Sequence, residues 1–353
     1  KMYIGTISPP LKTIAFWVLP SVIFFSALMA LLYHYGVMQR LVTAFAWLMQ
    51  KTMRVSGAES LSAAANIFVG QTEAPLVIRP FVHKMTDSEL NAVMVGGFAT
   101  VAGGVMAIYV GFLSDLPGIA GHLVTASIIS APAALAIAKI MVPETGTPAT
   151  SGDVSISYEK LDINGIDAVS RGTLEGLRLA LNIGAMLVVF VAIIAMVNGI
   201  LGLVGDLAAP DGVTTCSAEL NQCITERHYY PLSLQGICGY LFFPLALLMG
   251  IPWEEAMTVG TLLGEKIILT ELIAFSHLRD IQLAGEVLSE RSSIIASYAL
   301  CGFANFASIG IQIGGIGGIA PERRSDLARL GFRAMIGGTI AAMMTGGVAG
   351  VLL

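Results

Sequence analysis

The chain has 353 residues, and its composition is poor in charge and rich in apolar side chains. Charged residues make up 12% of the sequence and hydrophobic residues 55%, whereas soluble domains are about 25% charged. This composition excludes a disordered chain and a nucleic-acid-binding surface. It also disfavours a water-soluble enzyme, which needs charged side chains to coat its surface. We therefore predict a membrane protein that crosses the bilayer several times.

Six charge-free segments are long enough to cross a bilayer, because about 20 apolar residues span roughly 30 Å of hydrocarbon. They are residues 13–39, 90–114, 119–138, 179–205, 292–321 and 334–353. Basic residues gather in the loops 79–87, 139–178 and 321–333, whereas the loops 115–118 and 206–230 contain few. The positive-inside rule makes the basic loops cytoplasmic and puts the C-terminus outside. A disulfide between Cys216 and Cys223 is permitted in the outside loop.

Two stretches, 55–80 and 251–278, have the wrong pattern for a membrane span. Polar residues interrupt the first at 70–73, and Glu265, Lys266 and Glu271 interrupt the second. Neither stretch can cross the bilayer once, but each is long enough for two half-depth helices joined by a tip. We predict two re-entrant hairpins, which occur only where irregular backbone is buried in protein or lines a cavity.

The two halves of the chain repeat the same order of parts. Each hairpin precedes a span that contains Gly-Phe-Ala (97–99 and 302–304), where small and polar residues predict a break in the helix. The first copy, 13–143, comprises a span, an interfacial helix, hairpin 55–80, broken helix 87–114 and span 119–143. A cytoplasmic loop, 144–165, follows. The second copy, 166–353, comprises long span 166–205, outside loop 206–230, surface helix 233–250, hairpin 251–278, broken helix 286–318 and span 334–353.

The two copies enter the membrane from opposite sides. The predicted fold class is therefore an all-α polytopic membrane protein with inverted repeats, two re-entrant helical hairpins and two discontinuous transmembrane helices. Inverted repeats of this kind are typical of secondary transporters, whose binding site lies near the bilayer midplane. A chance recurrence of Gly-Phe-Ala in a chain rich in glycine and alanine is the alternative.

Two glutamates, Glu73 and Glu271, lie within the predicted hairpins. A carboxylate inside the bilayer is expensive, so it indicates function; the alternative is a surface glutamate at the mouth of a hairpin. Carboxylates accept hydrogen bonds from sugar hydroxyls, and they can also carry protons. Gln71 and Asn305 each offer a donor and an acceptor, and Ser308 lies one helical turn after Asn305.

A cation site requires several oxygen ligands near unwound backbone. Candidates are Asn66, Thr100 and the carbonyl groups of Val69 and Val101, at the first hairpin tip and the following helix break. As an alternative role, the Thr100 hydroxyl donates to the carbonyl four residues earlier. The sequence has no GxxxxGK[ST] phosphate loop, so ATP-driven transport is not expected, and no Cys/His cluster or Ser-His-Asp set predicts an enzyme.

The strings GQTEAPL (70–76), CGFANF (301–306) and SIGI (308–311) give nearly the whole chain a resemblance to the concentrative nucleoside transporters. The resemblance implies a homotrimer in the lipid of a bacterial inner (plasma) membrane. It implies Na⁺-coupled nucleoside symport into the cell by elevator-type alternating access. The implied nucleobase residues are Gln71, Thr72, Glu73 and Val105. The implied ribose residues are Glu271, Asn305 and Ser308, and the implied Na⁺ residues are Asn66, Val69, Thr100 and Val101.

Some features depart from the family pattern. The second hairpin contains Thr270-Glu271-Leu272 where the family commonly has Asn-Glu-Phe, and Ala307 occupies a position where serine is frequent. Family members usually have further N-terminal spans, and Lys1 is not a natural start, so we expect residues before it. The Thr100 hydroxyl favours Na⁺ over H⁺. The alternatives are H⁺-coupled symport with Glu73 or Glu271 titrating, a channel or another polar-solute transporter, a non-transporting receptor, and an intramembrane enzyme.

Overall fold

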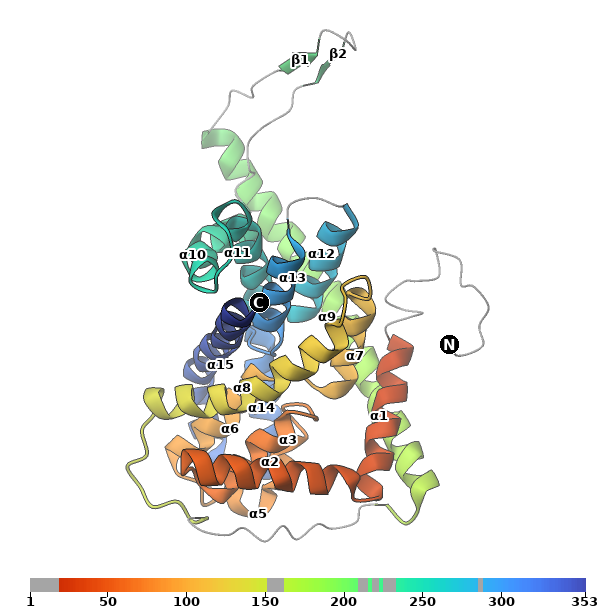
Figure 1. Ribbon diagram of the computed structural model, residues 1–353, viewed down its shortest axis with the longest axis vertical. Coiled ribbons are helices and arrows are strands. Elements are labelled where there is room, and N and C mark those ends of the chain that lie inside the picture. Colours follow the sequence, from red (N-terminus) through yellow and green to blue (C-terminus); the bar gives the residue numbers. More distant parts are fainter. Residues whose placement is uncertain (1–18, 151–161, 209–214, 218–221, 225–232, 285–287) are drawn as a thin grey trace.

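The computed structural model describes residues 19–150, 162–208, 215–217, 222–224, 233–284 and 288–353. This part of the chain is nearly all helical, which confirms the predicted helical class (Figure 1). The helices of the first half are α1 (Leu19–His34), α2 (Val37–Met53), α3 (Gly57–Asn66), α4 (Ala74–Val77), α5 (Arg79–Val82), α6 (Asp87–Ala99), α7 (Gly103–Phe112) and α8 (Ile119–Met141). Those of the second half are α9 (Gly165–Ala208), α10 (Leu234–Leu248), α11 (Trp253–Ile268), α12 (Glu271–Ala284), α13 (Glu290–Leu300), α14 (Phe306–Ile319), the 3₁₀ helix Pro321–Arg323 and α15 (Arg324–Leu352).

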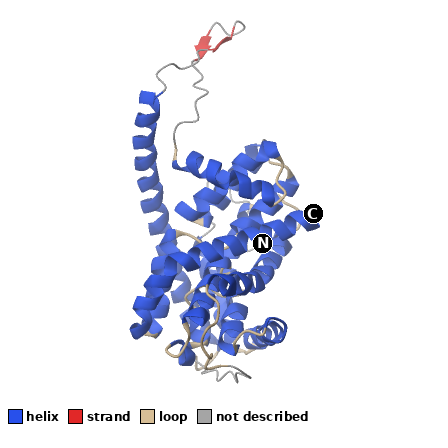
Figure 2. Cartoon of the chain, turned by 90° about the vertical axis from the view of Figure 1, so that its left-hand side faces the viewer, coloured by secondary structure: helices blue, strands red, loops and turns tan. Residues whose placement is uncertain are grey.

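One short β-hairpin, which the sequence did not predict, projects beyond the helices (Figure 2). Strands β1 (Thr215–Ser217) and β2 (Gln222–Ile224) pair antiparallel, and Cys216 and Cys223 are Cα partners in the register. This register agrees with the spacing on which the disulfide was predicted. The side chains of both cysteines lie outside the described part, so the disulfide stays a prediction.

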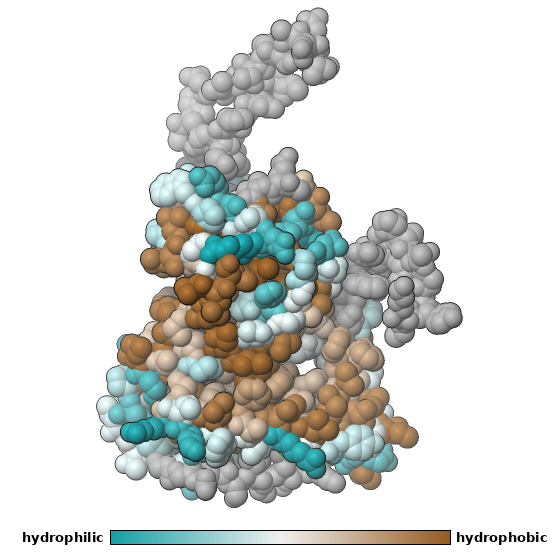
Figure 3. All heavy atoms as spheres, in the orientation of Figure 1, coloured by the Kyte–Doolittle hydropathy of each residue, from teal (hydrophilic) through white to brown (hydrophobic). Residues whose placement is uncertain are grey.

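Three helical segments of the described chain are long and apolar enough to cross a membrane: Asp87–Phe112, Ile119–Met141 and Pro321–Leu352. In Figure 3, apolar residues form a broad band across the middle of the visible face, and hydrophilic residues gather above and below it. Of the other predicted spans, 13–39 includes residues outside the described part, and 179–205 lies within the long helix α9. The span 292–321 is divided between α13 and α14.

Each predicted hairpin contains two helices joined by a short break. Ser56 caps α3 through a capping box with Glu59, and the chain turns after Asn66 before α4 begins at Ala74, with Pro75 in its first turn. In the second hairpin, the backbone leaves helical geometry at Leu269, between α11 and α12. These breaks coincide with the polar interruptions in the sequence. Re-entry from one side of the membrane stays a prediction.

The two predicted helix breaks meet inside the molecule. Residues 100–102 separate α6 from α7, and residues 301–305 separate α13 from α14. The Phe303 amide donates to the Thr100 carbonyl over 3.3 Å. Gly302 has a φ of +153°, and a Cβ there would lie 2.8 Å from the Ala99 carbonyl oxygen. The two Gly-Phe-Ala segments therefore pack backbone against backbone, which requires glycine at this contact.

The predicted cytoplasmic loops of both halves contact one another. Arg329 pairs with Asp87 over 2.7 Å, and Arg323 donates to the Met85 carbonyl over 2.6 Å. These bonds join the 3₁₀ helix and the first turns of α15 to the loop before α6 and to the first residue of α6. The contact supports the prediction that both loops lie on the same side of the membrane.

The start of α9 carries an ion pair that predicts a pH-dependent stability. Arg171 donates to both carboxylate oxygens of Asp162, over 2.7 and 2.9 Å, and this pairing lowers the pKa of Asp162. Because the folded-state pKa lies below the unfolded one, the pair stabilises the fold above about pH 4 and is lost as the pH falls through the folded pKa. We expect Asp162→Asn to lower the unfolding temperature in detergent at pH 7, with the difference from the unmodified protein shrinking below about pH 4.

A matched control is Glu175→Gln, because Glu175 is the more exposed partner of Arg171. An exposed ion pair contributes about 0–1 kcal/mol, so this variant should unfold close to the unmodified protein. A pH-independent defect of Asp162→Asn would contradict the ion-pair explanation.

Candidate functional site

The centre of the site is the buried carboxylate of Glu271, at the first residue of α12. It accepts a hydrogen bond from the Tyr109 hydroxyl over 3.0 Å and one from the Asn305 side-chain amide over 2.9 Å. Glu271 and Asn305 are 5% and 2% exposed. A buried carboxylate is tolerated when donors satisfy it. The structure thus brings α7, the second hairpin and the α13–α14 break to one point.

The first hairpin reaches the same region through Gln71. Its amide nitrogen donates to the Ser308 hydroxyl over 3.1 Å. Asn305 is the N-cap of α14, and its side-chain oxygen accepts from the Ser308 backbone amide over 2.9 Å. Four of the predicted site residues, from three separate parts of the sequence, therefore lie within one connected group: Gln71, Glu271, Asn305 and Ser308.

The other predicted nucleobase residues lie around the first hairpin tip. Glu73 is exposed, and its carboxylate folds over Gly70, where a Cβ would lie 2.5 Å from Oε2. Thr72 is half-buried against Gly315 of α14, while Val105 is 5% exposed on α7. Glu73 thus differs from Glu271, because its carboxylate lies at an exposed tip.

The predicted cation residues include a buried amide without a partner. Asn66 is 1% exposed, and neither its side-chain oxygen nor its nitrogen has a hydrogen-bond partner. Thr100 is also buried, and its hydroxyl donates to the Gly96 carbonyl over 2.8 Å, as in the alternative role considered above. That bond leaves the lone pairs of the hydroxyl oxygen free to accept. Leaving a buried amide unsatisfied costs about 1–3 kcal/mol, and a bound cation would satisfy its oxygen.

The Asn66 and Thr100 side-chain oxygens and the backbone carbonyl oxygens of Val69 and Val101 are neutral, hard donors, the type that Na⁺ prefers. Val101 is fully buried in the α6–α7 break, and Val69 is half-buried in the first tip. Among the described residues, no three His, Cys, Asp or Glu side chains gather as a metal site. The residues present therefore fit a weakly bound monovalent cation better than a divalent transition metal.

Two members of the site were missed by sequence reasoning. Tyr109 bonds to Glu271 and stacks on Phe275, with ring centroids 4.0 Å apart. Gln312 is fully buried, and its amide nitrogen donates to Gln71 Oε1 over 3.0 Å. Both follow a predicted site residue by four positions, so helical spacing could have found them. Tyr109 follows Val105, and Gln312 follows Ser308.

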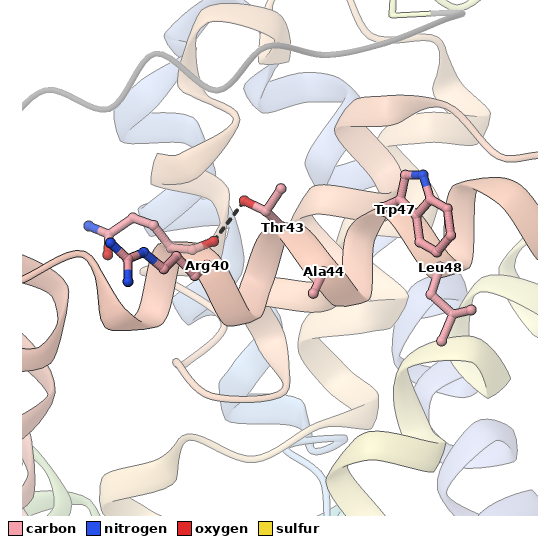
Figure 4. Close-up of a pocket in the computed structure, with 6 residues that line it drawn as sticks. Arg40, Thr43, Ala44, Trp47 and Leu48 are labelled. Carbon is pink, nitrogen blue, oxygen red and sulfur yellow. Dashed lines mark hydrogen bonds between the residues drawn. The ribbon is translucent and has the colours of Figure 1, made fainter.

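A separate pocket lies along α2 and is shown in Figure 4. Six residues of this one helix line it: Gln39, Arg40, Thr43, Ala44, Trp47 and Leu48. None of them belongs to the hydrogen-bonded group around Glu271. This pocket therefore gives no support to a second nucleoside site.

Broken helices that meet around buried polar side chains define a membrane transporter of the secondary class. The comparisons with known proteins agree. Residues 122–350 match the sequence model of the Na⁺ dependent nucleoside transporter C-terminus, and residues 15–116 match the nucleoside recognition (Gate) model. The chain belongs to the concentrative nucleoside transporter family. Its relatives are transporters and not enzymes.

Relatives from bacteria and animals are similar over nearly the whole chain. The "Uncharacterized transporter YutK" of Bacillus subtilis is 43% identical, over 95% of this chain and 77% of its own length. "Solute carrier family 28 member 3" of Eptatretus stoutii is 42% identical, over 96% of this chain and 48% of its own. The rat "Sodium/nucleoside cotransporter 1" is 40% identical, over 96% and 51%. The chain therefore spans about half the length of these animal relatives.

Solved structures of the transporter CNTnw share the fold. Its inward-facing substrate-bound state is 43% identical, with a TM-score of 0.83 over 96% of this chain and 75% of that one. A variant in an outward-facing state is 40% identical, with a TM-score of 0.85 over 99% and 79%. The relative therefore adopts alternating-access states.

Proposed function

We propose that the protein couples the inward movement of Na⁺ to the uptake of nucleosides. The observation that carries this proposal is the buried Glu271 carboxylate, held by Tyr109 and Asn305 where both helix breaks meet. A carboxylate and an amide in this position can together accept from and donate to the two adjacent hydroxyls of a ribose. The names of the matched family model and of the rat relative support the same substrate class and the same ion.

The proposed roles divide between the two halves of the chain. Glu271, Asn305 and Ser308 bind the ribose from the second half of the chain. Gln71, Thr72, Glu73 and Val105 face the nucleobase from the first. A nucleoside bound in this way would contact both the first hairpin and α14, which the Gln71–Ser308 bond already connects.

Coupling follows from the shared tip of the first hairpin. Asn66 ends α3, and Gln71 lies five residues later in the same turn. A Na⁺ ion bound by Asn66, Thr100 and the carbonyl groups of Val69 and Val101 would fix this tip and favour the Gln71 position that binds the base. Two ligands that order one segment bind cooperatively, and the coupling is reciprocal.

The transport cycle we propose is an elevator-type movement of the hairpin-bearing part against the rest of the chain. The homotrimer, the surrounding lipid and the bacterial inner membrane belong to the same proposal. The inward-facing and outward-facing structures of CNTnw support alternating access. An inverted repeat provides two similar halves that can exchange roles between the two states.

The direct test is radiolabelled uridine uptake into proteoliposomes, with Na⁺ or choline outside at fixed pH. We expect concentrative uptake that collapses in choline. Uptake that follows a pH gradient without Na⁺ would support H⁺ coupling through Glu73 or Glu271. Uptake that never exceeds the outside concentration would support a channel, and no uptake of any nucleoside would remove the substrate claim.

Asn66 provides a prediction specific to the ion. We expect Asn66→Leu to raise the Na⁺ concentration for half-maximal uptake at least tenfold, because the variant keeps the volume but lacks the ligand oxygen. Its thermal stability without Na⁺ should not fall, since the amide has no partner there. The measurement is the Na⁺-dependent shift in unfolding temperature, together with uptake.

The matched control is Ser62→Ala, one turn earlier on α3, where the buried hydroxyl also has no partner. This control should keep the Na⁺ response. An unchanged Na⁺ response in Asn66→Leu would remove Asn66 from the site.

A further inference from the structure

We infer that Gln312 is a positioning residue that makes Gln71 present its N–H groups, and not its carbonyl, to the nucleobase. The inference rests on the proposed function and deepens it, because it assigns the hydrogen-bonding class of nucleobase that the site selects. It is carried by a series of three hydrogen bonds between buried groups, which connects α6, the first hairpin and α14.

The series of hydrogen bonds begins at the backbone carbonyl of Met94. Gln312 is fully buried, and its amide nitrogen lies 3.1 Å from the Met94 carbonyl oxygen and 3.0 Å from Gln71 Oε1. Gln71 in turn donates from its nitrogen to the Ser308 hydroxyl over 3.1 Å. The oxygen of the Gln312 amide is buried without a partner.

The Met94 carbonyl fixes the donor-to-acceptor direction of this whole series of hydrogen bonds. A carbonyl can only accept, so the Gln312 atom beside it must be the NH₂ group. The same NH₂ group faces Gln71, which must therefore present its oxygen to Gln312 and its nitrogen to Ser308. The partnerless oxygen of Gln312 indicates the cost of this arrangement, since the reverse orientation would place two acceptors together.

Packing keeps both amides in place. A Cβ on Gly97 would lie 2.8 Å from the Gln312 nitrogen and 2.9 Å from Gln71 Cβ. The two side chains thus occupy the space that the absent Cβ leaves on α6. Close packing of this kind restricts the rotation that would let Gln71 exchange its oxygen and nitrogen.

Selectivity follows from the fixed orientation. One N–H of Gln71 bonds to Ser308, and the other remains to donate to a ligand. A base that offers a carbonyl oxygen there is accepted, whereas an exocyclic amine would place donor against donor. Sites built on directed hydrogen bonds reject a mismatched partner strongly, because the buried group loses its bond.

The test compares uptake efficiency, kcat/KM, for nucleosides that differ by a carbonyl-for-amine exchange: uridine against cytidine, and inosine against adenosine. We expect the unmodified protein to favour the carbonyl member of at least one pair. Gln312→Met has a similar volume but no amide, so Gln71 can turn. For the favoured pair, we expect the ratio of kcat/KM for the carbonyl-bearing nucleoside to that for the amine-bearing nucleoside to fall at least threefold, towards one.

Gln312→Glu adds an opposite prediction. An ionised carboxylate can only accept, so this variant loses the bond to the Met94 carbonyl, and Gln71 should reverse and present its own carbonyl to the base. We expect the ratio to move further than in Gln312→Met, towards the amine-bearing nucleoside. The unfolding temperature of each variant in detergent is measured alongside.

A matched control is Gln282→Met, because Gln282 lies on α12 and its amide donates to Ser293, outside the group around Glu271. This control should leave both ratios unchanged. Ratios that stay constant in both Gln312 variants, with uptake of all nucleosides reduced equally, would overturn the inference and leave a structural role. Absence of uptake by the unmodified protein would instead count against the proposed function.

Discussion

Replacing Glu271 by glutamine is expected to lower nucleoside uptake about 10- to 100-fold. The carboxylate accepts from both Tyr109 and Asn305 with its two oxygens. A glutamine amide keeps one oxygen and turns an NH₂ group towards one of these two donors. Loss of a hydrogen bond to a charged group costs about 1.5–3 kcal/mol, and about 1.4 kcal/mol corresponds to a factor of ten.

The measurement is initial uptake against nucleoside concentration in proteoliposomes. We expect the loss to appear mainly as weaker nucleoside binding, with Na⁺-dependent stabilisation retained, since the proposed cation residues lie on the first hairpin and its neighbouring break. Glu254→Gln is the matched control, because Glu254 is an exposed glutamate in the first turn of α11. Unmodified affinity in Glu271→Gln would refute the ribose role.

Replacing Gly302 by alanine is expected to destabilise the fold by roughly 2–6 kcal/mol, combining backbone strain and overpacking. The residue has a φ of +153°, and an added Cβ would meet the backbone oxygens of Ala99 and Phe98 at 2.8 and 2.9 Å. Neither atom belongs to a flexible side chain. The α6 and α13 breaks would therefore have to separate.

The measurement is the unfolding temperature in detergent, together with the yield of folded protein. Gly347→Ala is the control, because a Cβ on this α15 residue would meet nothing within 4 Å. That control should be neutral or slightly stabilising, since alanine favours the helix over glycine. Equal stability of Gly302→Ala and the unmodified protein would contradict the close contact between the two breaks.

The hydrophobic pattern predicted most helical segments, because charge and small-residue interruptions mark where apolar helices begin and end. Glu271, Asn305 and Ser308 were predicted as one group, and the structure brings them together. The contact between Thr100 and Phe303 could not be predicted from spacing, because it depends on how two distant helices cross. The β1–β2 hairpin was missed since strands of three residues carry too little periodicity.

The candidate site likewise contains features that the sequence predicts and features that depend on tertiary packing. Gln71 could be found as a polar residue in an apolar stretch, but the orientation of its amide depends on Met94 and Gln312, which lie on other helices. From the sequence, Tyr109 is an ordinary aromatic residue on an apolar helix face, and only the structure shows that its hydroxyl donates to Glu271. Residue type thus indicates candidates, while their partners come from tertiary packing.

The meeting of the two helix breaks also has an electrical consequence. Helices α6 and α13 end there, and α7 and α14 begin there. Helix C-termini carry partial negative charge and helix N-termini partial positive charge. The centre of the protein therefore presents both signs side by side, from backbone dipoles alone. The protein itself meets the negative end of α13 with a positive charge, because the buried Lys266 ammonium donates to the Ala299 carbonyl over 2.8 Å.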